Sequence, residues 1–175
     1  MKDLAPQDME NWHLGQDSLE KTMANFEHTL MCLNEAFARF NWQGLATAAH
    51  DLTFSSQDNT ILHIIHTLGR PKSVSDIARF LNRDDLANIQ YSIRKLLKAK
   101  FIEKADDRSS RGTTYRTTAS GKSVIDDYVN TRRNLVAKPA SDIANIEEQL
   151  QVATRAMGVF IGLYDHAARV LTTRP

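Results

Sequence analysis

Residues 73–118 read SVSDIARFLNRDDLANIQYSIRKLLKAKFIEKADDRSSRGTTYRTT, and this stretch decides the fold. It predicts a short helix, a tight turn, a second helix and then a charged hairpin. Ser73 and Asp76 have the spacing of a capping box, in which each side chain satisfies an orphan backbone N–H at the start of a helix. Asn82 can end this first helix, because asparagine tolerates the left-handed conformation.

The second helix has two distinct faces, and Asp84 or Asp85 can cap it. Ile89, Ile93 and Leu96 recur at helical spacing and predict a core face. The opposite face carries the amide, guanidinium and ammonium groups that read base edges and anchor phosphates. We therefore expect this helix to enter the major groove of DNA. The residues expected to contact DNA from the helix pair are Ser73, Asn88, Gln90, Tyr91, Arg94, Lys95 and Lys98.

A polar hairpin follows the helix pair. Phe101 begins one strand, and residues 113–118 (TTYRTT) are rich in strand-forming residues. Arg108 and Arg111 lie between them and are expected to contact phosphate or a narrow minor groove, with Asp107 pairing with a wing arginine and fixing its direction. The alternative for this loop is a solvated turn. A helix pair followed by such a hairpin indicates a winged helix-turn-helix, a DNA-binding module.

The distribution of charge supports a nucleic-acid partner. The chain of 175 residues has a net charge of only +1. The segment from Arg70 to Arg116, however, contains twelve Lys and Arg and only six Asp and Glu, so the remainder of the chain has a net negative charge. Positive charge concentrated on the DNA-binding segment predicts binding to double-stranded DNA that weakens steeply with salt, because released counterions drive it.

Apolar residues at both ends of the chain repeat every three and four residues, as in a coiled coil. The repeats predict long helices at both ends of the chain, with more apolar surface than a small domain can cover. We therefore expect a second copy of the chain to cover this surface and form a homodimer. The alternative is that the two terminal helices pack on each other within one chain. The expected interface residues are Leu19, Phe26, Leu30, Ile146, Leu150, Met157, Phe160 and Tyr164.

The predicted fold is mainly α with a small β-hairpin: a winged helix-turn-helix with long N- and C-terminal dimerisation helices. Gly44 is expected to break the first long helix and Pro139 to separate the last two. Because the chain has 175 residues, we expect one integrated domain. Its parts are a flexible leader at 1–17, N-terminal dimerisation helices at 18–52, the winged helix-turn-helix at 53–118 and C-terminal dimerisation helices at 119–175.

From residue 19 to residue 171 the order of elements resembles the MarR family of transcription regulators. The resemblance is carried by SVSDIARFLN, DLANIQYSIRKLLKAKFIEK, DRSSR and TTASG. It implies a homodimer that binds a roughly palindromic operator, most often as a repressor released by a small molecule, frequently an aromatic or phenolic acid. By position it assigns Asn88, Gln90, Tyr91 and Arg94 to the recognition helix and Arg108 and Arg111 to the wing.

Candidates for an effector site are the polar and aromatic residues that interrupt the early helices. Arg39 could pair with a carboxylate and Trp42 could stack on a ring, although a core position for Trp42 is the alternative. Two imidazoles spaced i, i+3 are a weak metal signal without a third ligand, so no metal and no cofactor is expected. The candidate effector-binding residues are His28, Arg39, Trp42, His63 and His66.

The sequence also bears on other classes of protein. The chain has no G-x-S-x-G, phosphate-binding glycine loop or H-E-x-x-H, so an enzyme is not expected. Cys32 is the only cysteine, which suits a reducing cytoplasm. It is expected to be a buried thiol, with a peroxide-sensing regulator as an alternative. A further alternative is a winged helix that binds proteins in place of DNA.

Overall fold

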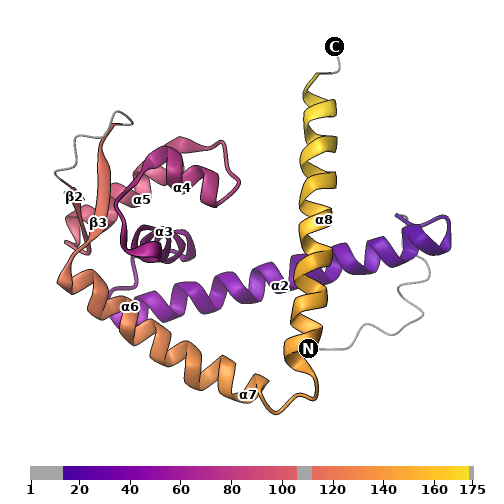
Figure 1. Ribbon diagram of the computed structural model, residues 1–175, viewed down its shortest axis with the longest axis horizontal. Coiled ribbons are helices and arrows are strands. Elements are labelled where there is room, and N and C mark those ends of the chain that lie inside the picture. The colour runs from indigo at the N-terminus through magenta and orange to yellow at the C-terminus, as the bar shows by residue number, and fades with distance from the viewer. Residues whose placement is uncertain (1–13, 106–111, 174–175) are drawn as a thin grey trace. The chain divides into compact units, whose positions relative to one another are not determined.

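The computed structural model describes residues 14–105 and 112–173. Where the sequence led us to expect one integrated domain, the internal contacts form two compact units, Met1–Val129 and Asn130–Pro175. The boundary falls inside helix α6 (Ala119–Arg132). The larger unit holds the helix pair and the hairpin, which Figure 1 shows as the group of α3, α4, α5, β2 and β3. The mainly helical fold with a small β-sheet and long terminal helices is as predicted.

Helix α2 (Ser18–Ala49) is the long helix of the larger unit. The prediction that Gly44 breaks it is wrong, because α2 continues past that position. A Cβ atom on Gly44 would lie 2.7 Å from the Tyr128 ring of α6. Gly44 is therefore a point of close contact between two helices, and this packing offsets the roughly 1 kcal/mol by which glycine disfavours a helix.

The caps predicted for the next helices are confirmed. Ser73 and Asp76 form the capping box of α4 (Val74–Phe80), and Asp85 caps α5 (Leu86–Lys98). Asn82 adopts the left-handed conformation in the turn, with φ of 51°. Helix α3 (Ser56–His66) precedes this helix pair and is followed by a 3₁₀ turn at Thr67–Gly69.

The hairpin is part of a three-stranded antiparallel sheet. Strands β2 (Ile102–Ala105) and β3 (Thr114–Thr117) pair with each other, and β1 (Lys72–Ser73) pairs with the other edge of β3. The sequence did not predict β1, because two residues carry no periodic pattern. Pairing of Lys72 with Tyr115 attaches the hairpin to the start of α4, which gives the wing a fixed root.

Lys72 is fully buried, which is rare for a lysine. Its ammonium donates hydrogen bonds to the carbonyl oxygens of Ile65 at 3.3 Å, Arg70 at 3.1 Å and Thr67. One side chain therefore satisfies three carbonyls around the end of α3. The surrounding core is apolar and draws on α2, α3, α4, α5, β2 and α6: Leu45, Phe54, Ile61, Leu62, Ile65, Ile77, Ile89, Ile93, Leu96, Phe101, Ile102, Val124 and Ile125.

The smaller unit begins at the end of α6 and continues through a π-helical turn (Arg133–Ala137) into α7 (Lys138–Ala140). Pro139 does not separate the helices as predicted, since it lies in α7 and the break follows it. After a left-handed Asn145, helix α8 (Ile146–Thr172) runs without a buried residue.

Candidate nucleic-acid interface

Helix α5 is amphipathic in the way that a recognition helix requires. Ile89, Ile93 and Leu96 are buried in the core. The opposite face is exposed, and the Tyr91 side chain on it is 58% accessible. The Arg94 guanidinium lies over the Tyr91 ring, 5.9 Å from the ring centroid, so the two side chains make a cation–π contact on this face. The predicted DNA-contacting residues that α5 leaves exposed are Asn88, Gln90, Tyr91, Arg94 and Lys98.

Gln57 of α3 holds the start of α5 in place. Its side-chain amide donates to the Asn88 carbonyl at 3.0 Å and to the Ser92 hydroxyl at 3.1 Å. Its Oε1 accepts a hydrogen bond of 2.7 Å from Arg83, which precedes α5. The same arginine is 3.5 Å from the carboxylate of Asp85, the cap of α5. The turn and the recognition helix are therefore fixed by one amide that the sequence did not single out.

Lys95 has a different role from the one expected. Its ammonium lies 2.5 Å from Asp58 Oδ2 and donates to the Thr53 carbonyl at 2.8 Å. Burial opposes ionisation of Asp58, but hydrogen bonds from Lys95, Ser92 and Ser55 outweigh it and lower the pKa of that carboxyl. Lys95 therefore joins α5 to α3, and we withdraw it from the predicted phosphate contacts.

Ser73 is also removed from the DNA-contacting set. It is 2% exposed, and its hydroxyl accepts from the Asp76 N–H at 3.1 Å and donates to the Asp76 carboxylate at 2.8 Å. A hydroxyl used in this way inside the fold is not presented to a ligand. The capping-box spacing had already indicated this local role.

The residues predicted for the tip of the wing, Asp107, Arg108 and Arg111, lie outside the described residues. At the root, Arg116 of β3 pairs with Glu103 of β2 at 2.7 Å. Two further basic residues, Arg79 and Arg83, were not predicted. They line a depression of about 420 Å³ at the turn between α4 and α5, together with Ser75, Ala78, Asn82, Asp84 and Leu86. Their position just before the recognition helix could have suggested a role.

The candidate effector residues occupy separate surroundings. His28 is half-buried with Nε2 3.6 Å from Cys32 Sγ, whereas Arg39 is exposed and Trp42 is 39% exposed. Cys32 itself is exposed, contrary to the expected buried thiol. Neither the depression at the helix-turn-helix turn nor the one beside the wing root is lined by any of the five candidates.

His63 and His66 both lie at the junction of α3 with its neighbours. The His63 ring is 4.7 Å from the Tyr128 ring, and burial followed by the charge of His66 lowers the pKa of His63. His66 Nδ1 is 2.9 Å from the Thr117 hydroxyl of β3. Among the described residues no three His, Cys, Asp or Glu side chains are grouped to bind a metal ion. None of the described helices is both long and apolar enough to cross a membrane.

Apolar side chains remain exposed on both terminal helices. On α2 they include Leu19, which is 69% exposed, and Leu30, which is 37% exposed. On α8 they include Leu150 and Tyr164, at 56% and 41%. The other predicted interface residues are half-buried: Phe26, Ile146, Met157 and Phe160.

Residues 54–121, which span α3 to the start of α6, match the family described as "Winged helix DNA-binding domain". This match agrees with the winged helix fold that α3 to β3 adopt in the structure. No curated protein sequence matches the chain.

Most of the chain has the fold of solved structures of MarR family transcription regulators. A crystal structure of a MarR family transcription regulator is 15% identical, with a TM-score of 0.62 over 89% of this chain and 96% of that one. The S. aureus MepR–DNA complex is 16% identical, with a TM-score of 0.62 over 79% and 96%. Staphylococcus aureus MarR in complex with salicylate and kanamycin is 13% identical, with a TM-score of 0.65 over 83% and 94%. The resemblance drawn from the sequence is thus confirmed for the fold.

Proposed function

We propose that this protein is a sequence-specific, DNA-binding transcription regulator that acts as a homodimer on a roughly palindromic operator, most simply as a repressor. The observation that carries this proposal is the two-sided α5. Its apolar face is buried, Gln57 and Asp58 hold it from α3, and its free face presents Asn88, Gln90, Tyr91, Arg94 and Lys98. Amide and guanidinium groups on a rigid helix are what direct readout of bases needs.

The homodimer is proposed from the exposed apolar residues of α2 and α8. Leu150, Val159, Ile161 and Leu163 on α8 are each more than half exposed. Exposed apolar residues in this number along one helix favour a protein–protein contact, and a second copy of the chain supplies a matching surface. Two recognition helices related by a twofold axis would read two half-sites about one turn of the duplex apart.

Release of DNA by a small molecule, such as an aromatic acid, is the remaining part of the proposal. It is supported by the salicylate complex that shares this fold and by the aromatic and cationic residues of α2 and α3. A screen of small aromatic acids by thermal shift, followed by DNA-binding titration, tests it. An acid that raises the melting temperature and weakens DNA binding is the expected result.

Fluorescence anisotropy with the duplex upstream of this protein's own gene tests DNA binding directly. Titrations at two salt concentrations should show tight binding at low salt that falls steeply at high salt, because each neutralised phosphate releases a counterion. A scrambled duplex of equal length is the control for specificity. Absent or salt-independent binding would support a winged helix that contacts other proteins.

A further inference from the structure

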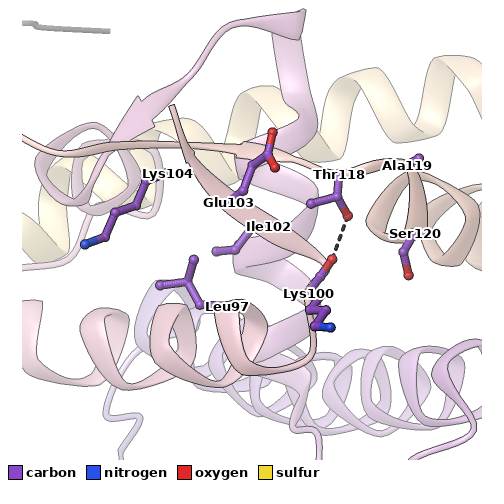
Figure 2. A pocket seen from close by; sticks show the side chains of 8 residues that line it. All are labelled: Leu97, Lys100, Ile102, Glu103, Lys104, Thr118, Ala119 and Ser120. Atoms are coloured by element: carbon purple, nitrogen blue, oxygen red, sulfur yellow. Dashed lines mark hydrogen bonds between the residues drawn. The ribbon is translucent and has the colours of Figure 1, made fainter. Parts of the chain in front are cut away.

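A groove beside the wing root has no role in the proposed DNA binding. It has a volume of about 640 Å³ and lies between the end of α5, strand β2 and the start of α6. This volume is within the range of small-molecule sites, which is roughly 300–1,000 Å³. The groove is lined by Leu97, Lys100, Ile102, Glu103, Lys104, Thr118, Ala119 and Ser120 (Figure 2).

The floor of the groove is apolar. Figure 2 shows the Leu97 and Ile102 side chains directed toward the space between α5 and β2. Ala119 adds a methyl group from the first residue of α6. Ile102 is already buried, so an apolar part of a ligand placed here would cover the half-buried Leu97 and the exposed Ala119, and that burial favours binding.

The charge at one end of the groove is positive. Lys100 is exposed, and no carboxylate among the described residues lies within ion-pair distance of its ammonium. The carboxylate of Glu103 does not neutralise it, since that group pairs with Arg116 at 2.7 Å. Figure 2 places Lys100 and Ser120 toward the same end of the groove and Lys104 toward the other.

The start of α6 adds hydrogen-bond donors at that end. Thr118 caps the helix, because its hydroxyl oxygen accepts from the Gly121 N–H at 3.0 Å and its carbonyl accepts from Lys122. The described residues provide no acceptor for the N–H groups of Ala119 and Ser120. Free N–H groups and the helix dipole favour an anion, here next to a lysine and above an apolar floor.

The groove is also rigid. The Thr118 hydroxyl donates to the Lys100 carbonyl at 2.7 Å, and the Thr118 N–H donates to the Phe101 carbonyl at 3.1 Å. A Cβ atom on Gly121 would lie 1.9 Å from the Phe101 oxygen, so α6 packs directly on the chain that leaves α5. A preformed groove loses little conformational freedom when a ligand binds.

We propose that this groove binds a small organic anion with an apolar tail, whose carboxylate contacts Lys100 and the start of α6 and whose tail covers Leu97. The site belongs to the winged helix itself and shares no residue with the effector candidates of α2 and α3. Binding is expected without DNA, so this proposal and the proposed regulatory function can fail separately.

Hexanoate titrated into ¹⁵N-labelled full-length protein tests the site, with chemical shifts followed by NMR. We expect saturable binding with a Kd of about 1 mM, as befits a ligand of this size, and the largest shifts at Ala119, Ser120 and Ile102. Hexanamide lacks the charge and acetate lacks the tail. Each should bind at least about fivefold more weakly, the factor that roughly 1 kcal/mol represents.

Two variants separate the site from general charge effects. Lys100→Met keeps the aliphatic stem and should weaken hexanoate binding about fivefold. Ala119→Asp puts a carboxylate at the first position of α6, where the helix tolerates it, and should abolish binding. Lys122→Met, an exposed lysine of α6 that does not line the groove, is the matched control and should bind hexanoate normally.

The proposal is overturned if hexanamide binds as tightly as hexanoate, if the shifts gather on another surface, or if Lys100→Met and Lys122→Met behave alike. Absence of saturable binding up to roughly 20 mM, well above the expected Kd, would overturn it as well. Unchanged circular dichroism of each variant establishes that a loss of binding is not a loss of fold.

Discussion

Asp58 at the start of α3 and Lys95 near the end of α5 are joined by an ion pair of 2.5 Å, and the Asp58 side chain is almost completely buried. The pair connects the helix that carries much of the core to the helix that faces DNA. The Lys95 ammonium also lies 5.3 Å from the centre of the Phe54 ring, so it makes a cation–π contact with an aromatic residue of the core.

Removing one partner of this pair should destabilise the protein. Lys95→Met keeps the stem but leaves the Asp58 carboxylate buried without its cation, so we expect a loss of about 2–4 kcal/mol in the free energy of unfolding. Urea denaturation measures it. The double variant Asp58→Asn, Lys95→Met should recover part of the loss, and equal stability of Lys95→Met and the parent would contradict the role assigned to the pair.

Arg94→Ala should weaken operator binding by about 1–3 kcal/mol, the range for a base-contacting arginine, while the dimer stays intact. Anisotropy titration measures the affinity, and sedimentation measures the oligomeric state. Lys122→Ala removes an equal charge from the exposed surface of α6 and should bind the operator nearly as the parent does. Equal affinity of the two variants would remove Arg94 from the interface.

Gln57→Glu should reduce discrimination between operator and scrambled DNA. The variant retains an acceptor for Arg83 but loses the donors to the Asn88 carbonyl and the Ser92 hydroxyl. We expect the start of α5 to move, which lowers the ratio of specific to non-specific affinity by about tenfold. A variant with parental specificity would show that the core alone positions α5.

Met157→Lys should yield monomers that bind DNA poorly. The substitution places a charge within the apolar seam of α8, where a second copy would have to bury it without a partner. Analytical ultracentrifugation distinguishes monomer from dimer. Arg155→Gln, a change at an exposed α8 position outside the seam, is the control and should leave the assembly unchanged.

Stability should fall with acid because of His63. Burial keeps this imidazole neutral in the folded protein, so its folded pKa is below the ordinary value of 6.5 and the unfolded chain takes up the proton first. The stability from the neutral ring is fully present above pH 6.5 and decreases as the pH falls below it. His63→Phe keeps an aromatic ring against Tyr128 and should flatten the curve measured between pH 7 and pH 5. An identical slope in this variant would assign the pH dependence to other groups.

The parts of the fold that sequence predicted are those decided by neighbouring residues. Caps at Ser73 and Asp85 and the left-handed Asn82 depend on spacings of a few positions, so they can be read locally. Gly44 and Lys95 were misread because their partners, Tyr128 and Asp58, lie far away in the chain. Helical periodicity places Lys95 on the polar side of its helix, but only the folded structure shows that the Asp58 carboxylate lies next to it.

The same distinction applies to the candidate site. The exposed face of α5 follows from helical periodicity alone, and it was predicted correctly in outline. Gln57 and Arg83 were missed because their hydrogen bonds join segments that no pattern links. The groove beside the wing root combines residues of α5, β2 and α6, so it exists only once these elements are packed.

The buried ammonium of Lys72, a residue of β1 at the root of the wing, holds the end of α3 through its hydrogen bonds to backbone carbonyls. Its withdrawal would release three carbonyls together, so these backbone segments should open as one cooperative unit and not fray separately. In hydrogen exchange, amides of the two segments should share one opening free energy. Any force that pulls the wing outward is therefore resisted by the whole winged helix.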